Sequence, residues 1–371
     1  MHTSELTPAV LEGLRRPRPY PAISLLMPTH RHRPETAQDP IRLRNLLDEA
    51  RKRIADDHQV GRAERIELEG QLDLVASDVD FLHAEDGLLV LIAPGERHIW
   101  QLSSPVAVQE RLVLANTFLT RNLVAARLYA RPYWVLVVSE ETTRLLEGSG
   151  DRLVPVERHG FPLEPGIPDP QDAVPGPNIG SVPGHQREER MRQYLRSVDA
   201  ALDKALHQEH RPVFLVGTAG TVTLLAELSQ HPQDLVGRLD RAGLDKAPAH
   251  ELAERLRPVI DDYKARSTAA ALEQLGDARG RRRFAGGLDE VWRAVNEGRG
   301  SLLLVEEHFQ VAARIEDDHL VLAEGGIASD GVEEDVVDQL IETALDKETE
   351  VRFVPDDSLS DDGRVALVLR Y

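Results

Sequence analysis

The sequence predicts an α/β protein made of three α/β domains, and three observations support this prediction. The chain has 371 residues, which is too long for one ordinary hydrophobic core. Short apolar runs of strand length alternate with longer segments in which apolar residues recur at helical spacing. Arg131-Pro132 and the basic run that starts at Arg281 interrupt this alternation. We therefore expect domains at residues 1–132, 133–280 and 281–371.

The first domain, residues 1–132, is predicted to contain both helices and strands. A short apolar run before Pro28 is typical of a buried strand. Asp39 followed by Pro40 is the pairing of N-cap and first helical residue expected where a helix begins. A Pro-Gly pair after residue 93 separates two apolar runs and predicts a hairpin turn. The predicted elements are strands at 23–27, 87–92 and 98–102 and helices at 40–54 and 66–82.

The second domain, residues 133–280, is predicted to open with a meander of three strands and to continue with helices around a further buried strand. Between residues 160 and 184, twelve of 25 residues are glycine or proline. A stretch of this length without structure is usually a functional loop or a disordered one, and we expect it to be mobile in the isolated protein. The predicted elements are strands at 133–139, 142–147, 152–156 and 212–217 and helices at 187–208, 222–228 and 247–275.

The third domain, residues 281–371, follows the basic run Arg281-Arg282-Arg283. Its alternation of helices and strands predicts a small three-layer α/β domain. The predicted elements are helices at 288–296 and 333–345 and strands at 301–305, 310–315, 351–354 and 365–370.

Composition restricts the classes of function. The chain has no cysteine, which excludes disulfides, thiolate nucleophiles and cysteine zinc sites and suits a cytoplasmic protein. No apolar run is long enough to span a membrane, and the N-terminus does not resemble a signal peptide. The net charge of −19 is distributed unevenly, because residues 1–132 carry −1, residues 133–280 carry −6 and residues 281–371 carry −12. The acidic last domain would suit a basic partner and would avoid RNA.

Basic residues gather in the first domain, where a polyanion could bind because phosphate contact depends on local charge. The alternative is a solvated helix face, in which these residues pair with Asp48, Glu49, Asp56 and Asp57. Both interpretations remain open. The basic residues are Arg15, Arg16, Arg18, Arg31, Arg33, Arg42, Arg44, Arg51, Lys52 and Arg53.

Other motifs do not support an enzyme site. Residues 217–221 (GTAGT) follow a strand and open a helix, as a phosphate loop would, but they lack the Walker lysine and its spacing. His30 and His32 have no third metal ligand nearby, and alternate residues of a strand face opposite ways. A surface pair or an RNA-facing pair is therefore the favoured interpretation. We predict neither a metal nor a cofactor.

Three segments together resemble a known protein family. Residues 282–305 (RRFAGGLDEVWRAVNEGRGSLLLV) are similar to the start of the C-terminal domain of class-1 release factors and Pelota. Residues 23–30 (ISLLMPTH) and the arginine-bearing helix after them resemble the first domain of that family. The strand meander, long loop, helix and LVG strand of residues 133–217 resemble its RNase H-like central domain. The chain is therefore identified as similar to the bacterial branch of the archaeo-eukaryotic-type release factors, and to the third of its families.

In this family the central loop ends in Gly-Gly-Gln, which reaches the peptidyl transferase centre and positions water against the peptidyl-tRNA ester. The matching residues are Gly184, His185 and Gln186, directly before the predicted helix. His185 replaces the second glycine, where the backbone must approach the terminal adenosine closely. Three interpretations stay open: a simple loop end, contact with RNA without chemistry, and peptidyl-tRNA hydrolysis with these three residues as the catalytic group.

The codon-reading motif of termination factors, Asn-Ile-Lys-Ser, is absent from residues 1–132. The resemblance therefore implies a ribosome-binding factor of the rescue or hibernation type, which occupies the A-site region without reading stop codons. The implied partners are ribosomal RNA, P-site tRNA and, through residues 281–371, a translational GTPase or the ribosomal stalk. A nucleic-acid phosphoesterase is a weaker alternative, because the first strand of the RNase H-like domain offers no carboxylate before Glu140. The predicted RNA-binding residues are His30, Arg31, His32, Arg33, Arg42, Arg44, Arg51, Arg187 and Arg190.

Overall fold

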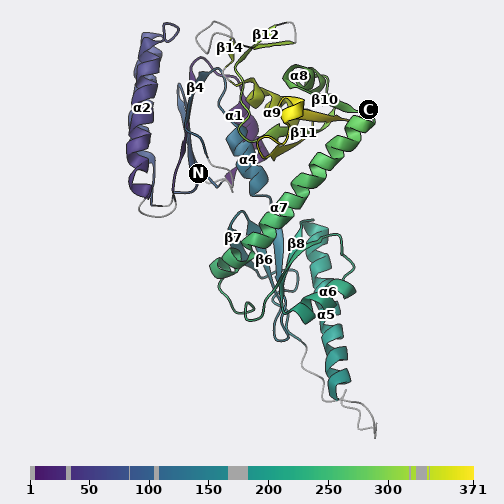
Figure 1. The fold of residues 1–371 in the computed structure, drawn as a ribbon. Coiled ribbons are helices and arrows are strands. Elements are labelled where there is room, and N and C mark those ends of the chain that lie inside the picture. The colour runs from purple at the N-terminus through teal and green to yellow at the C-terminus, as the bar shows by residue number, and fades with distance from the viewer. Residues whose placement is uncertain are drawn as a thin grey trace. The chain divides into compact units, whose positions relative to one another are not determined.

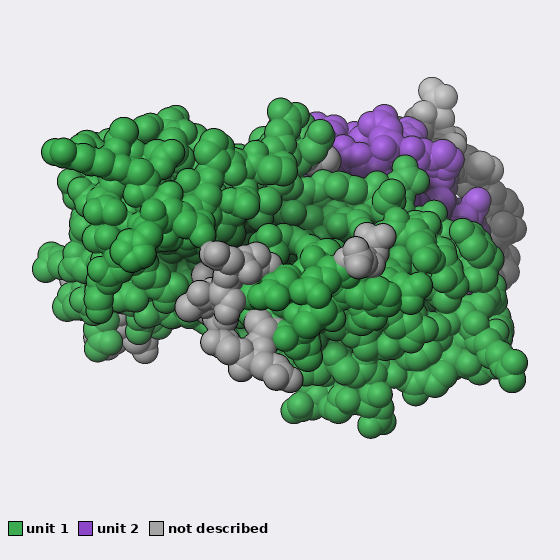
Figure 2. Space-filling model, turned by 90° about the horizontal axis from the view of Figure 1, so that it is seen from above, with its two compact units in different colours: residues 1–130, 268–371 green, residues 131–267 purple. Residues whose placement is uncertain are grey.

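The structure is a computed structural model that describes the chain except for residues 1–4, 31–34, 83, 104–107, 166–182, 317–318, 323–331 and 334. Helices and strands alternate along the described residues, so the predicted α/β fold class is confirmed. The chain divides into two compact units, residues 1–130 with 268–371 and residues 131–267 (Figures 1 and 2). None of the described helices is both long and apolar enough to cross a membrane.

The N-terminal part of the first unit contains α1 (Pro8–Arg15), β1 (Ala22–Pro28), η2 (Glu35–Ala37), α2 (Asp39–Asp56), α3 (Arg62–Asp78), β2 (Gly87–Ala93), β3 (Glu96–Leu102), β4 (Arg111–Ala115) and α4 (Arg121–Tyr129). Its antiparallel sheet has the strand order β3-β2-β1-β4, with Ile23 of β1 opposite Ile92 of β2. Every residue of β2 is buried, because both faces of the sheet are covered. Helices α2 and α3 pack on one of these faces.

The C-terminal part of the first unit contains the end of α7 (Ala249–Gly280), β10 (Phe284–Gly286), α8 (Leu288–Asn296), β11 (Gly300–Glu306), β12 (Ala313–Glu316), β13 (His319–Leu322), β14 (Val332–Glu333), α9 (Val336–Asp346), β15 (Glu350–Val354), η3 (Ser360–Asp362) and β16 (Val365–Leu369). Its main sheet has the order β10-β16-β11-β15, and a small sheet has the order β13-β12-β14. The end of α7 packs on one face of the main sheet, and α8 and α9 pack on the other. This is the three-layer architecture that the sequence predicts.

The two parts of the first unit share one hydrophobic core. Phe118 and Leu123 of the N-terminal part lie in the same buried cluster as Val337 and Leu340 of α9. The boundary predicted near residue 132 lies next to the observed division, whereas the chain returns to the first unit inside α7. The separation of residues 1–132 and 281–371 into two independent domains remains a prediction.

The second unit contains β5 (Tyr133–Val137), β6 (Arg144–Ser149), β7 (Arg152–Val156), α5 (Pro183–Gln208), β8 (Val213–Gly217), α6 (Ala219–Leu228), β9 (Leu235–Asp240) and the first part of α7. Its sheet has the order β7-β6-β5-β8-β9. The first three strands are antiparallel and the last two are parallel to β5, so the sheet is mixed. Helices α5 and α6 cover one face, and α7 covers the other.

Several elements differ from the predictions. Helix α2 begins at Asp39 instead of being capped by it, because the carboxylate of Asp39 is turned into the protein and bonds to His30. Helix α5 begins at Pro183 rather than near residue 187. Of the stretch predicted to be mobile, residues 166–182 lie outside the described residues. Among the described elements, the sequence did not predict η2, η3, α1, α4, β4, β9, β10, β13 or β14.

Candidate functional site

The candidate site is the start of helix α5, which holds Gly184, His185 and Gln186 in its first turn. Proline suits the first position of a helix, and Pro183 occupies it here. Residues 187–190 are all exposed, and from residue 187 onward the first buried residue of the helix is Tyr194. With a rise of about 1.5 Å per residue, the backbone of Gly184 lies roughly 15 Å along the axis beyond Tyr194. Figure 1 shows these first turns running beyond the sheet of the same unit.

The other end of this projecting segment is firmly attached to its unit. The hydroxyl of Tyr194 lies 2.8 Å from the carbonyl of Leu163 and 2.7 Å from Oγ1 of Thr143. Burial raises the pKa of Tyr194, so the hydroxyl stays neutral. One turn later, the carboxylate of Asp199 accepts hydrogen bonds from Oγ of Ser229 at 2.6 Å and from the following backbone N–H at 3.1 Å. These contacts hold the helix on its unit from residue 194 onward.

The exposed turns of α5 are rich in arginine. Arg187 donates a hydrogen bond to the carboxylate of Glu140, which directly raises the pKa of that guanidinium. Glu140 follows β5, so this contact links the start of α5 to the end of the central strand. Arg190 is exposed and makes no ion pair with any residue that the structure describes. A helix of this kind presents cationic groups next to the unsatisfied N–H groups of its first turn.

The predicted RNA-binding residues of the first unit are largely paired with acids. The backbone N–H and the Nδ1 of His30 both lie 2.9 Å from the carboxylate of Asp39. Arg42 lies 3.7 Å from the same carboxylate. Arg51 pairs with Asp48 at 2.6 Å and with a second acid from α3 at 2.7 Å.

The pair of Arg51 with Asp48 is one that the solvated-face interpretation names, whereas Asp39 is buried. Arg44 differs, because it is exposed and has no ion pair with a described residue. Arg31, His32 and Arg33 lie outside the described residues. RNA binding by this group therefore remains a prediction, and it belongs to a different unit from the start of α5.

The motifs set aside in the sequence have structural roles. A Cβ at Gly217 would lie 2.6 Å from the carbonyl of Val138, so glycine is needed for the close approach of the two strands. Thr218 caps helix α6 with its hydroxyl. No three histidine or acidic side chains gather as a metal site among the residues described.

The second unit also has a shallow, mostly apolar groove of about 590 Å³ beside edge strand β9. None of the predicted site residues lines it. Nη2 of Arg266 donates to the carbonyl of Val236 at 2.8 Å and so satisfies part of the open strand edge. The lining residues are Leu215, Ala226, Leu235, Val236, Gly237, Arg238, Pro258, Val259, Asp262 and Arg266.

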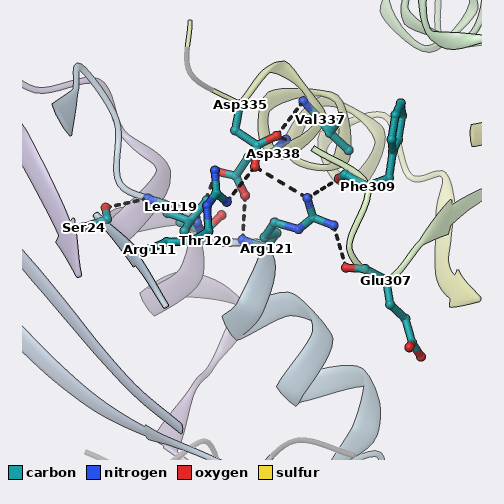
Figure 3. A network of polar contacts seen from close by, with 10 residues as sticks. All are labelled: Ser24, Arg111, Leu119, Thr120, Arg121, Glu307, Phe309, Asp335, Val337 and Asp338. Atoms are coloured by element: carbon teal, nitrogen blue, oxygen red, sulfur yellow. Dashed lines mark hydrogen bonds and ion pairs between the residues drawn. The ribbon is translucent and has the colours of Figure 1, made fainter. Parts of the chain in front are cut away.

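A buried charged network, which the sequence did not reveal, joins α4 and α9 in the first unit (Figure 3). The carboxylate of Asp338 accepts hydrogen bonds from the backbone N–H of Arg121 at 2.6 Å and of Thr120 at 3.2 Å. It therefore caps the start of α4 from a distant part of the chain. Asp335 lies 3.0 Å from the guanidinium of Arg111 and 3.5 Å from that of Arg121.

The remaining contacts of this network leave its arginine fully satisfied. Arg121, only 2% exposed, donates to the carbonyls of Phe309 at 2.5 Å and Glu307 at 3.0 Å. The hydroxyl of Thr120 donates to Glu342 at 2.6 Å. Burial and the charge of Asp338 raise the pKa of Glu342 to about 9, so Glu342 carries a proton at neutral pH. The network joins the N-terminal and C-terminal parts of the first unit along the surface where they meet, which we call the seam. Because it holds the two parts together, we call the network the lock.

Comparison with known proteins places the candidate site in a family. Residues 132–299 match the family described as bacterial archaeo-eukaryotic release factor family 3. This match includes the whole of α5 and so the three residues at its start. No curated protein matches the chain.

Solved structures are similar to the chain at low sequence identity. The archaeal translation termination factor aRF1 is 16% identical over 100% of this chain and 99% of its own, with a TM-score of 0.27. Pelota of Archaeoglobus fulgidus is 15% identical over 77% of this chain and 79% of its own, with a TM-score of 0.37. Dom34 of S. cerevisiae is 12% identical over 77% of this chain and 73% of its own, with a TM-score of 0.41. At such values the likeness alone says nothing about activity. The match of residues 132–299 to the bacterial archaeo-eukaryotic release factor family 3 supports the resemblance seen in the sequence.

Proposed function

We propose that this protein is a cytoplasmic, ribosome-binding translation factor of the rescue or hibernation type. In this proposal it occupies the A-site region, does not read stop codons and directs the start of α5 toward the peptidyl transferase centre. The family of residues 132–299 supports a release-factor-like role. A solved relative is described as ribosome-bound archaeal Pelota with ABCE1, and Dom34 is described as interacting with Hbs1. These descriptions suggest a comparable partner for residues 281–371 of this chain.

The observation that carries the proposal is the exposed, cationic start of α5. A helix whose residues 187–190 are exposed, and which is tied to its own unit there through the ion pair of Arg187 with Glu140, can enter a narrow site in another molecule. Its unsatisfied N–H groups and the side chains of Arg187 and Arg190 favour an anion, and ribosomal RNA and tRNA supply phosphate there.

Contact without chemistry is the form of this function that the residues favour. His185 adds a Cβ and an imidazole where the family has a glycine, and this obstructs close approach of the backbone to a tRNA end. Peptidyl-tRNA hydrolysis is the second candidate, because Gly184 and Gln186 retain the first and last positions of the family motif. A phosphoesterase would need clustered carboxylates, and Glu140 pairs with Arg187 rather than with other acids among the described residues.

Co-sedimentation with purified ribosomes at several salt concentrations tests the proposal. We expect the wild type to bind. The double variant Arg187→Glu, Arg190→Glu should bind more weakly, with a log–log salt slope reduced by about two because about two phosphate contacts are lost. Lys204→Glu, Arg255→Glu reverses two other exposed cations of the second unit, is the control matched in charge and should behave as the wild type. Absence of ribosome binding by the wild type would refute the proposed function.

A further inference from the structure

The main sheet of the C-terminal part has charges of opposite sign at its two ends. All four strands carry a cationic residue at one end, just outside the strand. These are Arg283 before β10, Arg370 after β16, Arg299 before β11 and Lys347 three residues before β15. Because β16 is antiparallel to β10 and β11, and β15 is parallel to β11, these four positions meet at the same end of the sheet.

Hydrogen bonds hold this end together. The N–H of Leu369 donates to the carbonyl of Arg283 at 3.0 Å, and the N–H of Arg370 donates to the carbonyl of Arg299 at 2.9 Å. The side chain of Arg370 donates to the carbonyl of Lys347 at 3.0 Å. Four separate segments are thus fixed beside one another, and with about 4.8 Å between strands the row spans roughly 14 Å.

The cationic groups of this end are available to a partner. Arg281, Arg282, Arg283, Lys347 and Arg370 are exposed, and Arg299 is half-buried. Arg299 has an acid partner, Glu297, at 3.1 Å. Two of the nearby acids already have other partners, since Asp346 pairs with Arg15 and Glu350 pairs with Arg352 at 2.9 Å. The three that remain, Asp277, Glu297 and Glu348, are fewer than the six cations, so the end has a positive local charge within a segment whose total is −12.

The opposite end of the same sheet holds most of the neighbouring acid. Glu306 ends β11, Glu307 follows it, and Asp356, Asp357, Asp361 and Asp362 lie between β15 and β16. The cation at this end, Arg364, pairs with Glu306 at 2.7 Å. The net charge of the segment therefore does not describe both of its ends, and local rather than total charge decides whether a polyanion can bind.

We propose that the cationic end of this sheet, defined by Arg281, Arg282, Arg283, Arg299, Lys347 and Arg370, is a second RNA-binding surface that contacts the phosphate backbone of ribosomal RNA. A row of cations about 14 Å long, fixed by backbone hydrogen bonds, fits several successive phosphates. The naming of ribosomal RNA rests on the proposed function, whereas the affinity for RNA phosphate does not. This surface differs from the start of α5 in position and in unit.

The test uses the full-length protein and protein-free ribosomal RNA in a filter-binding titration at several salt concentrations. The variant Arg281→Glu, Arg283→Glu, Lys347→Glu leaves Arg370 and its structural hydrogen bonds intact. We expect its affinity to fall at least tenfold and its salt slope to decrease by two to three, because that number of phosphate contacts is lost. The variant Arg281→Lys, Arg283→Lys, Lys347→Arg keeps the charges and should bind like the wild type. Thermal unfolding of each variant checks that the unit remains folded.

A control with the same total charge excludes a general electrostatic effect. Arg152→Glu, Lys204→Glu, Arg255→Glu changes three exposed cations of the second unit, and its RNA affinity should stay within about twofold of the wild type. Equal loss of affinity in this control would overturn the proposal. Loss of ribosome binding by the first variant with unchanged binding to free RNA would also overturn it and would indicate an acidic protein partner. Loss of RNA binding by the first variant alone would support the surface even if the start of α5 proved not to bind ribosomes.

Discussion

The starts of helices α4 and α5 form an instructive contrast. Both helices lack an acidic residue in their first turn, and both carry arginine near it. In α4 the first residue is Arg121, and acids from the distant helix α9 surround it. In α5 the residues after the first turn are exposed, and Glu140 is the acid that contacts them from another element.

Positive charge at the start of α4 has a structural role, whereas positive charge at the start of α5 has a role in binding in the proposed function. A cation near the positive end of a helix is unfavourable unless an anion compensates it. The protein supplies that anion internally for α4, through Asp335 and Asp338, and the seam of the first unit closes around it. At the start of α5 the compensation is incomplete, so an external anion such as a phosphate group would complete it.

The largest effect on stability should come from deleting the segment that supplies Asp335 and Asp338. Deletion of residues 281–371 takes away α9 and much of the core that it shares with Phe118 and Leu123. We expect residues 1–130 to lose their hydrogen-exchange protection, because a large apolar surface becomes exposed to water. The sheet of the second unit, which has its own core, should keep its protection and serves as the internal reference. Retained protection of β1 and β2 would instead support the prediction of three independent domains.

A single substitution in the lock should have the next largest effect. Asp338→Ala leaves the N–H groups of Thr120 and Arg121 buried without an acceptor, which should destabilise the first unit by about 2–4 kcal/mol. The free energy of unfolding from chemical denaturation measures this loss, and the hydrogen-exchange protection of α4 shows whether it arises at the start of that helix. Asp338→Asn retains one acceptor oxygen and should cost less. Equal stability of Asp338→Ala and the wild type would show that the seam does not depend on this cap.

The pH dependence of the lock should be smaller but characteristic. Burial, together with the charge of Asp338, raises the pKa of Glu342 from 4.5 to about 9. The folded first unit thus binds this proton more tightly than the unfolded chain, so its contribution to stability is complete below about pH 4.5 and is lost as the pH rises toward 9. Glu342→Gln removes this proton exchange and should reduce the slope of stability against pH, most clearly between about pH 7 and 9, because burial also raises the pKa of Asp338 to about 7. If the variant shows the same slope of stability against pH as the wild type, Glu342 is not the titrating group.

The comparison also explains what could be predicted from the sequence. Strands β1 and β2 are continuous apolar runs, so their burial could be predicted from local pattern alone. Helix α4 could not, because it is only nine residues long and its start is stabilised by Asp338, which is distant in the sequence. The count of charged residues gives residues 281–371 a net negative charge. The topology of the main sheet places cations at one end and most of the acids at the other.

The candidate site was located by a different kind of signal. No periodicity or charge pattern distinguishes Gly184, His185 and Gln186 from an ordinary loop end, and the resemblance to release factors identified them. Pattern reasoning did predict the long helix after them, although not its beginning at Pro183. The ion pair of Arg51 with Asp48 was also open to prediction, because residues three apart are neighbours on a helix.

The smallest effect is expected on the rate of peptide release when residues at the start of α5 are substituted. If this helix start only contacts RNA, the wild type should not release peptide from peptidyl-tRNA on ribosomes with an empty A site above the spontaneous rate. Gln186→Ala should then leave that rate unchanged while the protein still competes with A-site tRNA. We expect this outcome, because the side chain of His185 prevents the close backbone approach that hydrolysis requires. His185→Gly restores the glycine of the family and serves as the sensitive control, since any latent hydrolysis should rise in that variant first. Rapid release by the wild type that Gln186→Ala abolishes would show instead that the helix start is a catalytic centre, and the contrast with α4 would then be one between structure and catalysis.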